Sequence, residues 1–300
     1  MRVVITGASG FIGKPLTESL SELGHDVLAI ARKIPKSSNS TKIFWLEADL
    51  SSSSTYKNSI KEFYPEVIIH LAWQDIPDFS LEKSQLNLNQ SKEFLSFIAS
   101  IKSCKKLLIP GSCLEYSNPK GECLETDQAL PSNDFTRAKH SLRLWVELLC
   151  NEESISLAWF RVFYVYGPGQ RTESLIPTIL TQLKKGRLPN INTPQNSNDF
   201  VFIDDVVNAF IIATNTRFVS GIYNLGSGMS TSVLDVCRYA EEIVLNSTAL
   251  SESLEAESQA KSLNMNFWAG IAATKKSFNW SPKINILDGI KQTWKNINNP

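Results

Sequence analysis

Three glycines near the N-terminus limit what this chain can fold into. Gly7, Gly10 and Gly13 follow an apolar run at residues 2–6 and precede a segment with helical periodicity at 14–23. This spacing allows a tight strand-to-helix turn, where backbone N–H groups at the helix start can approach a pyrophosphate. The turn predicts a βαβ unit that binds a dinucleotide. A tight turn without a ligand is the alternative.

Apolar runs alternate with amphipathic segments over the first 165 residues, a pattern typical of repeated βαβ units. Because the runs are apolar along their length, we expect each strand to be buried on both faces. The predicted fold class is α/β, a Rossmann-type doubly wound parallel sheet with a smaller C-terminal lobe. The predicted strands are 2–6, 26–32, 43–50, 66–73, 105–112 and 157–167.

The pattern changes after residue 167, where Pro168 and Gly169 interrupt the chain. A strand followed by an apolar helix near 199–216 then resembles the first half again. We therefore expect a first domain with a returning segment, and a lobe built from the rest. The predicted boundaries are 1–167 with 199–216 for the first domain, and 168–198 with 217–300 for the lobe.

Charge and cysteine content exclude several classes of protein. Thirty basic residues balance thirty acidic ones, so no electrostatic case exists for nucleic acid or a membrane surface as partner. The five cysteines are scattered, which indicates neither a disulfide framework nor a metal site. The sequence lacks the ~18-residue apolar run of a membrane span and the regions of a signal peptide. We expect a cytoplasmic protein.

The end of the second predicted strand bears on the choice of dinucleotide. A carboxylate there would bind the adenosine ribose of NAD, whereas a cation would meet the 2′-phosphate of NADP. This chain has Arg32 and Lys33, and no acid before Glu47. NADP is therefore favoured, and NAD stays open if the two cations are only solvated. Asp49 and Leu50, after the third strand, are expected to border the adenine.

Eight segments resemble, in order and spacing, the extended short-chain dehydrogenase/reductase family of NAD(P)-dependent nucleotide-sugar epimerases, dehydratases and 4-keto reductases. They are TGASGFIG, ADL, HLAW, GSCLEY, FTRAK, RVFYVYGPG, DFVFIDDV and YNLGSG. The resemblance implies a dinucleotide-binding domain, a substrate-binding lobe for a nucleotide-diphosphate sugar, and a homodimer formed through helices near 86–103 and 139–151. It also implies further cofactor contacts from Phe11, Ile12, Leu71, Ala72 and Trp73.

The resemblance assigns catalytic roles and shows one departure. In this family a Ser or Thr binds the reacting sugar oxygen, a Tyr exchanges its proton, and a Lys four residues later lowers the pKa of that Tyr and holds the nicotinamide ribose. Ser112 and Lys139 match the first and last positions, but Phe135 stands where the tyrosine belongs. A phenyl ring has no proton to exchange.

Three explanations of Phe135 stay open: an engineered inactive variant, a natural enzyme with another proton donor, or a non-catalytic dinucleotide-binding protein. Tyr164 stands where relatives usually carry an asparagine, and it is the candidate for an alternative acid. A residue that only shapes the substrate pocket is the other interpretation of Tyr164.

The residues after Ser112 separate the reaction types within the family. Its 4,6-dehydratases carry an Asp-Glu pair there, and its 3,5-epimerase/reductases carry a Cys two residues on, whereas this chain has Cys113 and Leu114. We therefore expect NADP-dependent reduction of a nucleotide-linked 4-keto sugar at C-4, with an NAD-dependent 4-epimerase or C-4 dehydrogenase as the alternative. Arg171 and Arg187 are the expected diphosphate contacts, unless they only form a charged helix face.

Overall fold

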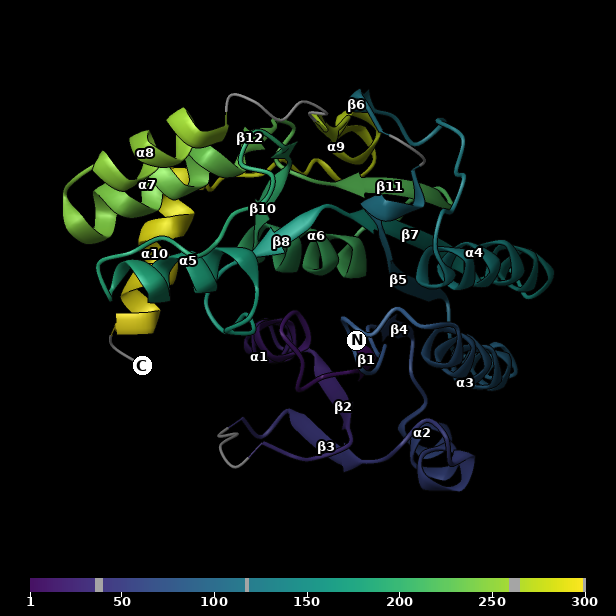
Figure 1. Ribbon diagram of the computed structural model, residues 1–300. Helices are drawn as coiled ribbons and strands as arrows, with labels where there is room; N and C mark the ends of the chain where they lie inside the picture. The colour runs from purple at the N-terminus through teal and green to yellow at the C-terminus, as the bar shows by residue number, and fades with distance from the viewer. Residues whose placement is uncertain (36–39, 117–118, 259–264, 299–300) are drawn as a thin grey trace.

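A seven-stranded sheet forms the centre of the computed structural model, which describes residues 1–35, 40–116, 119–258 and 265–298. All neighbouring strands are parallel, in the order β11-β7-β5-β4-β1-β2-β3 (Figure 1). This confirms the predicted α/β class with a Rossmann-type sheet. The strands are β1 Arg2–Thr6, β2 Asp26–Ala31, β3 Ile43–Glu47, β4 Val67–His70, β5 Lys106–Ser112, β7 Ser156–Val162 and β11 Gly221–Leu225.

Helices cover both faces of this sheet (Figure 1). On one face α1 (Gly13–Glu22) packs against α6 (Ile203–Asn215), and on the other α3 (Leu81–Ala99) packs along α4 (Asp134–Glu152). The short α2 (Lys57–Phe63) lies near the β3 edge. Across the described ranges, none of the helices has both the length and the apolar character that a membrane span requires.

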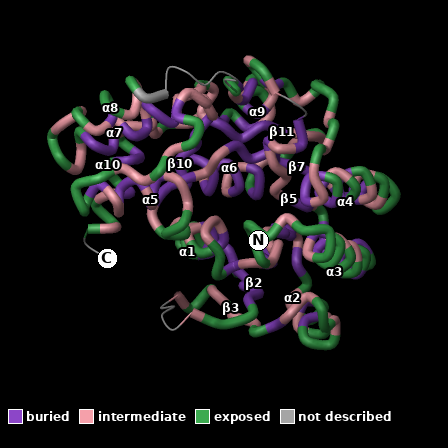
Figure 2. Tube along the Cα trace, in the orientation of Figure 1, coloured by how far each residue is buried: buried purple, intermediate pink, exposed green. Residues whose placement is uncertain are grey.

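The alternation of side chains along each strand explains why both faces are covered. Val3 and Ile5 of β1 belong to the core beside α1 and α6, whereas Val4 belongs to the core beside α3 and α4. Each strand therefore needs apolar residues at consecutive positions, which is the pattern in the sequence. Figure 2 shows the central strands as largely buried and the edge strand β3 as partly exposed, with exposed residues on the outer sides of α3 and α4.

The predicted strand 157–167 is wrong in one respect, because the chain changes partners at Phe163. The N–H of Phe163 donates to the Leu225 carbonyl at 2.9 Å, and the N–H of the next residue donates to the Asp199 carbonyl at 3.0 Å. Beyond this point β8 (Tyr164–Tyr166) leaves the main sheet and pairs in parallel with β10 (Phe200–Phe202). A run of mostly apolar residues that continues through Phe163 cannot reveal such a change of partner.

The second half of the chain forms a set of shorter elements at one end of the sheet (Figure 1). One strand from this half, β11, joins the main sheet as its edge, although we had assigned 217–300 to the lobe. In the part of the chain that the structure describes, the other elements form three two-stranded sheets and several helices, and β6 from the first half of the chain takes part in one of these sheets by pairing with β13. They are β6 Gly121–Cys123, α5 Leu175–Leu183, β9 Ser197–Asn198, β12 Thr231–Ser232, α7 Val233–Leu245, α8 Ala249–Ser258, β13 Phe267–Ala269, α9 Ala272–Phe278 and α10 Ile286–Asn298.

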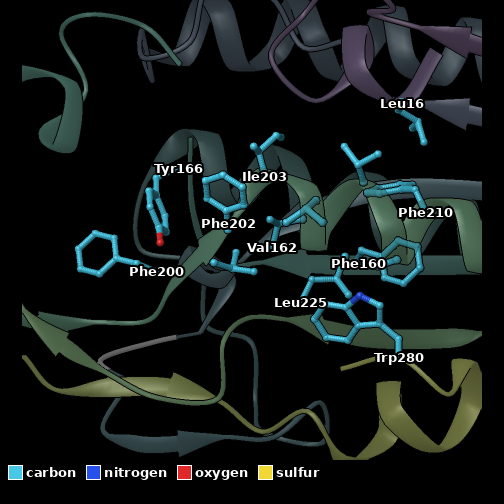
Figure 3. Packing of buried hydrophobic residues seen from close by; sticks show 14 of the residues in the cluster. Leu16, Phe160, Val162, Tyr166, Phe200, Phe202, Ile203, Phe210, Leu225 and Trp280 are labelled. Atoms are coloured by element: carbon cyan, nitrogen blue, oxygen red, sulfur yellow. The ribbon is translucent and has the colours of Figure 1, made fainter. Parts of the chain in front are cut away.

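An aromatic cluster joins these elements to the main sheet (Figure 3). Phe160 of β7 lies 4.9 Å from the ring centre of Phe210 on α6 and 5.7 Å from that of Phe278 on α9. Trp280, which follows α9, donates its indole N–H to the Asp205 carbonyl at 3.0 Å. The packing fixes the lobe against the end of the sheet that carries the site described below.

Phe210→Ala tests this cluster. We expect the free energy of unfolding to fall by about 3–5 kcal/mol, because the substitution leaves a cavity among fully buried rings. Urea denaturation followed by circular dichroism measures the change. Val219→Ala, at a side chain that is 79% exposed, is the matched control and should change the stability little; a loss below ~1 kcal/mol for Phe210→Ala would contradict the assignment.

Candidate cofactor cleft and active site

A cleft of about 630 Å³ opens at the carboxyl ends of the strands. It lies beside β1, where the strand order runs to β2 on one side and to β4 on the other, which is where α/β sheets bind ligands. The predicted residues that line it are Gly7, Gly10, Arg32, Lys33, Asp49, Leu50, Leu71, Ala72 and Trp73. Sequence reasoning missed Thr6, Ser9, Ile30, Ala31, Ala48, Gln74, Asn87, Gln90 and Ser91.

The glycine turn has the backbone geometry that a diphosphate requires. Gly7 has a positive φ of 67°, and a Cβ there would lie 3.0 Å from the backbone nitrogen of Ala72. The N–H of Gly10 donates to the Gly7 carbonyl at 2.9 Å, which closes the turn. Within the described chain no side chain caps the start of α1 at Gly13. The N–H of Lys14 already donates to the Gly10 carbonyl at 2.9 Å and Pro15 has no N–H, so the first turn of the helix has few N–H groups left for an anion. The predicted Phe11 and Ile12 lie in the turn and Gly13 begins α1, and none of the three is a lining residue.

The far end of the cleft carries the cations predicted to select the dinucleotide. Arg32 donates from its guanidinium to the Gln74 side-chain oxygen at 3.2 Å, and this contact is exposed. A phosphate is a stronger acceptor than an amide oxygen and could replace it. Hydrogen bonds from Ser51 hold the pKa of Asp49 below its usual value, so Asp49 is a carboxylate on the same wall.

Ser112 ends β5 and caps the 3-10 helix η2 (Cys113–Glu115). Its hydroxyl oxygen accepts the N–H of Leu114 at 3.2 Å, and its own N–H donates to the Glu115 carboxylate at 2.9 Å. The hydroxyl thus keeps its proton for donation. Cys113 and Leu114 pack into an apolar cluster, and burial raises the pKa of the Cys113 thiol, so neither residue can exchange protons near neutral pH.

Lys139 reaches the same strand end from α4. Its ammonium donates to the Pro110 carbonyl at 3.1 Å and lies 3.9 Å from the ring centre of Trp73. Lys139 is not a lining residue of the cleft, but it contacts Trp73, which is one. Burial lowers the pKa of Lys139 to about 7, while the charge of Glu115 acts in the opposite direction.

Phe135, one helical turn before Lys139, is 6% exposed and packs in an aromatic group. Its ring meets that of Trp73 edge-on at 5.6 Å and that of Phe79 at 4.6 Å between ring centres. These contacts are apolar, so the phenyl ring suits its position without a hydroxyl. Phe79 comes from the loop after β4, which sequence reasoning did not connect with the site.

Tyr164 lies at the start of β8, between Phe200 and Phe267, with ring centres 6.0 and 6.2 Å away. Burial raises the pKa of its phenol, so the hydroxyl holds its proton at neutral pH. It packs against the same cluster as Cys113, the residue after Ser112. Tyr164 therefore shares a cluster with the residue that follows Ser112, and its role as an alternative acid stays a prediction.

The two predicted diphosphate contacts, Arg171 and Arg187, are exposed and bond to different segments. Arg171 donates to the carbonyl of Ile76, in the loop after β4. Arg187 donates to the side chain of Gln182 at 2.9 Å, close to its own helix. Only Arg171 bridges the lobe and the loop beside the cleft.

A buried ion pair behind Ser112 was missed. The Glu115 carboxylate accepts from Arg161 Nε at 3.3 Å and from the Trp159 indole N–H at 3.0 Å. Two sequence signals could have revealed it. Ser112 and Glu115 have the S-x-x-E spacing of a capping box, and Arg161 is a charge inside an apolar strand, which requires a partner.

Known proteins share this sequence pattern and this fold. The chain matches the model of the NAD dependent epimerase/dehydratase family over residues 3–226. It belongs to that family. The members are nucleotide-sugar enzymes, and an NAD(P) dinucleotide is their typical cofactor.

Two curated relatives extend over almost the whole chain. CDP-abequose synthase of Salmonella typhimurium is 27% identical over 98% of both proteins. The dTDP-6-deoxy-L-talose 4-dehydrogenase (NAD(P)(+)) of Kitasatospora kifunensis is 22% identical over 98% of this chain and 94% of its own length. In structure, the UDP-glucose 4-epimerase of Thermotoga maritima superposes with a TM-score of 0.84 at 19% identity over 99% of both chains, which supports the fold.

The lowered pKa of Lys139 predicts a pH-dependent stability. In the unfolded chain a lysine has a pKa of ~10.4, so between pH 7 and 10 the unfolded state binds more protons than the folded state. Burial of Lys139 therefore destabilises the fold most below pH 7. Above pH 7 the free energy of unfolding rises by up to about 1.4 kcal/mol per pH unit because of this residue. Urea denaturation of the wild type and Lys139→Met from pH 6 to 10 should show this slope in their difference; a flat difference would contradict the lowered pKa.

Proposed function

We propose that this protein uses NADPH to reduce a nucleotide-linked 4-keto deoxysugar at C-4. The main observation in support is the set of groups around the end of β5. Ser112 has a hydroxyl proton to donate, Lys139 lies beside the same strand end, and the two side chains after Ser112 are packed away from proton exchange. Such a site can orient a carbonyl, but it lacks the acid-base pair that eliminates water or inverts neighbouring carbons.

In the proposed reaction a bound NADPH would supply the hydride to C-4. Ser112 would donate its hydroxyl proton in a hydrogen bond to the carbonyl oxygen and so stabilise the negative charge that develops there. The Lys139 ammonium would hold the nicotinamide ribose and add positive charge to the same region. Arg171 and Arg187 are the proposed partners of the sugar diphosphate.

The proton for the new hydroxyl group has to come from a residue other than Phe135. Tyr164 is the proposed donor, because it is a protonated phenol in the cluster that contains Cys113. A general acid typically contributes ~100- to 10,000-fold to a rate. If Tyr164 is less well placed than a phenol at position 135 would be, turnover will be slow but measurable.

The name of one relative supports chemistry at C-4. That relative is a 4-dehydrogenase that uses NAD(P)(+), and oxidation of a C-4 alcohol is the reverse of the reduction proposed here. The two relatives act on CDP- and dTDP-linked sugars by name, so these nucleotides are the first to test. The C-4 dehydrogenase direction is therefore the second candidate function.

The helices α3 and α4 suggest a homodimer. Their outer sides expose four large apolar side chains to solvent. These are Leu81, Leu86, Leu144 and Leu148. We place the subunit contact there, as the family resemblance implies.

Turnover with Phe135→Tyr tests the missing proton. We expect slow oxidation of NADPH by the wild type with a CDP- or dTDP-linked 4-keto-6-deoxy sugar, and a kcat about 100- to 10,000-fold higher for Phe135→Tyr, because a phenol next to Lys139 restores the acid. Absorbance at the nicotinamide band gives the rate. Tyr164→Phe should lower the wild-type rate but not that of Phe135→Tyr, and Tyr239→Phe on α7 is the matched control. NADPH binding without turnover in both proteins would reject the reductase.

Arg32→Ala tests the choice of dinucleotide. Loss of a charge-assisted hydrogen bond to the 2′-phosphate should weaken NADPH binding by about 10- to 100-fold and leave NADH binding nearly unchanged. Fluorescence titration with each dinucleotide gives both affinities. Arg137→Ala, at an exposed arginine paired with Asp134, is the control, and an equal loss for the two dinucleotides would argue for NAD.

A further inference from the structure

Glu115 is a fully buried carboxylate directly behind Ser112. One oxygen accepts the backbone N–H of Ser112 at 2.9 Å and the indole N–H of Trp159 at 3.0 Å. The other oxygen accepts Trp159 at 3.2 Å and Arg161 Nε at 3.3 Å. The carboxylate therefore connects the end of β5 to two side chains of the neighbouring strand β7.

The space around Glu115 is closed. A Cβ on Gly111 would collide with the Trp159 indole and with the Glu115 carboxylate, so the strand that leads to Ser112 packs directly on both groups. Arg161 is 1% exposed, donates to the Glu125 carbonyl at 3.4 Å and lies 4.4 Å from the ring centre of Tyr116. Small movements of Ser112 would disturb all of these contacts.

Stability alone is a weak reason for such a pair. The desolvation of two buried charges offsets most of their attraction, and apolar replacements of similar volume are often neutral or stabilising. The position of the pair offers another reason, because its carboxylate neighbours the two groups to which we assign chemistry. Glu115 accepts the N–H of Ser112 at 2.9 Å, and the Lys139 ammonium donates to the carbonyl of Pro110, two residues earlier on the same strand, at 3.1 Å. The charge of Glu115 also acts on Lys139.

Lys139 has few other charged neighbours. From β4 it faces His70, whose ring is held between Thr6 at 2.8 Å and Ser91 at 3.1 Å. Burial lowers the pKa of His70 to about 3, so that ring is neutral. From η2 it faces Glu115, whose charge raises the pKa of Lys139. Arg161 from β7 is already paired with Glu115.

We propose that Glu115 is a positioning residue that holds Ser112 at the end of β5 and supplies the negative charge that faces the Lys139 ammonium, which is bonded to the same strand end. The Ser112 part rests on the proposed function; the Lys139 part depends only on the folded protein. Glu115 takes no proton from substrate. It acts through the two residues that would contact the sugar and the cofactor.

The test measures the titration of Lys139 without any ligand. The difference in unfolding free energy between a protein and its Lys139→Met variant is flat below the folded pKa of Lys139 and changes with pH above it. The pH at which this difference begins to change is called the bend. We expect the bend near pH 7 in the wild type. In a Glu115→Gln background it should lie at least about one pH unit lower, since an adjacent opposite charge shifts a pKa by roughly 1–3 units. Urea denaturation from pH 5 to 10 locates the bend.

Glu241→Gln is the matched control, because Glu241 is also a fully buried carboxylate. It accepts the N–H groups of Leu250 at 3.0 Å and Ser251 at 2.8 Å and so joins α7 to α8. Its loss should destabilise the protein without moving the bend. An unmoved bend in folded Glu115→Gln would overturn the proposal.

A double variant covers the case in which Glu115→Gln alone fails to fold. Glu115→Gln with Arg161→Met removes both charges, so no unpaired ion stays buried. The bend should again lie below that of the wild type. A bend near pH 7 in this double variant would equally overturn the proposal.

Kinetics test the Ser112 part separately. With an active 4-keto sugar, Glu115→Gln should lower kcat with little change in KM, and the pH profile should shift downward, whereas Glu241→Gln should leave both unchanged. An unchanged kcat would refute the role toward Ser112. If no protein turns over, the reductase is rejected, together with the Ser112 part that rests on it, and the pH bend still decides the Lys139 part.

Discussion

The buried contact between Glu115 and Arg161 is the interaction on which the arrangement of the site depends. β5 ends at Ser112 and is followed directly by η2. The Glu115 carboxylate of η2 forms an ion pair with Arg161 on β7. Arg161 also donates to the Glu125 carbonyl, and Glu125 in turn accepts the N–H of Asn224 on β11 at 2.9 Å. One polar network therefore crosses from β5 through β7 to the edge strand contributed by the second half of the chain.

This network explains why a polar site can lie against an apolar core. Side chains alternate between the two faces of β7. Trp159 and Arg161 point toward Glu115, and Phe160 points toward the aromatic cluster of Figure 3. The N–H of Ser112, the Trp159 indole N–H and Arg161 Nε all have the Glu115 carboxylate as acceptor, which avoids the large cost of a polar group buried without a partner. The rigid strand end in turn gives Ser112 a fixed orientation, as a preorganised hydrogen-bond donor requires.

Local signals in the sequence predicted the fold and most of one cleft wall, and contacts between distant segments account for what was missed. The glycine turn, the strand-end cations at Arg32 and the apolar strands are features of single segments, so they can be read from consecutive residues. The change of partner at Phe163 depends on where Leu225 and Asp199 lie. The contact of Phe79 with Phe135 likewise depends on a loop whose path is set by tertiary packing. Gln74 and Asn87 line the cleft for the same reason, because they bond to each other across a loop and a helix.

The structure changes what Phe135 means for the site. A lysine that serves a neighbouring phenol must be charged in order to lower the pKa of that phenol. Here the phenol is absent, yet Lys139 still lies against Trp73 and within reach of the charge of Glu115. Burial alone would favour the neutral amine, and the charge of Glu115 opposes this effect. An ammonium at this position fits the proposal that Lys139 holds the ribose of the dinucleotide. A phenylalanine at position 135 therefore removes proton exchange but does not change the charges around Lys139, on which the proposed cofactor binding depends.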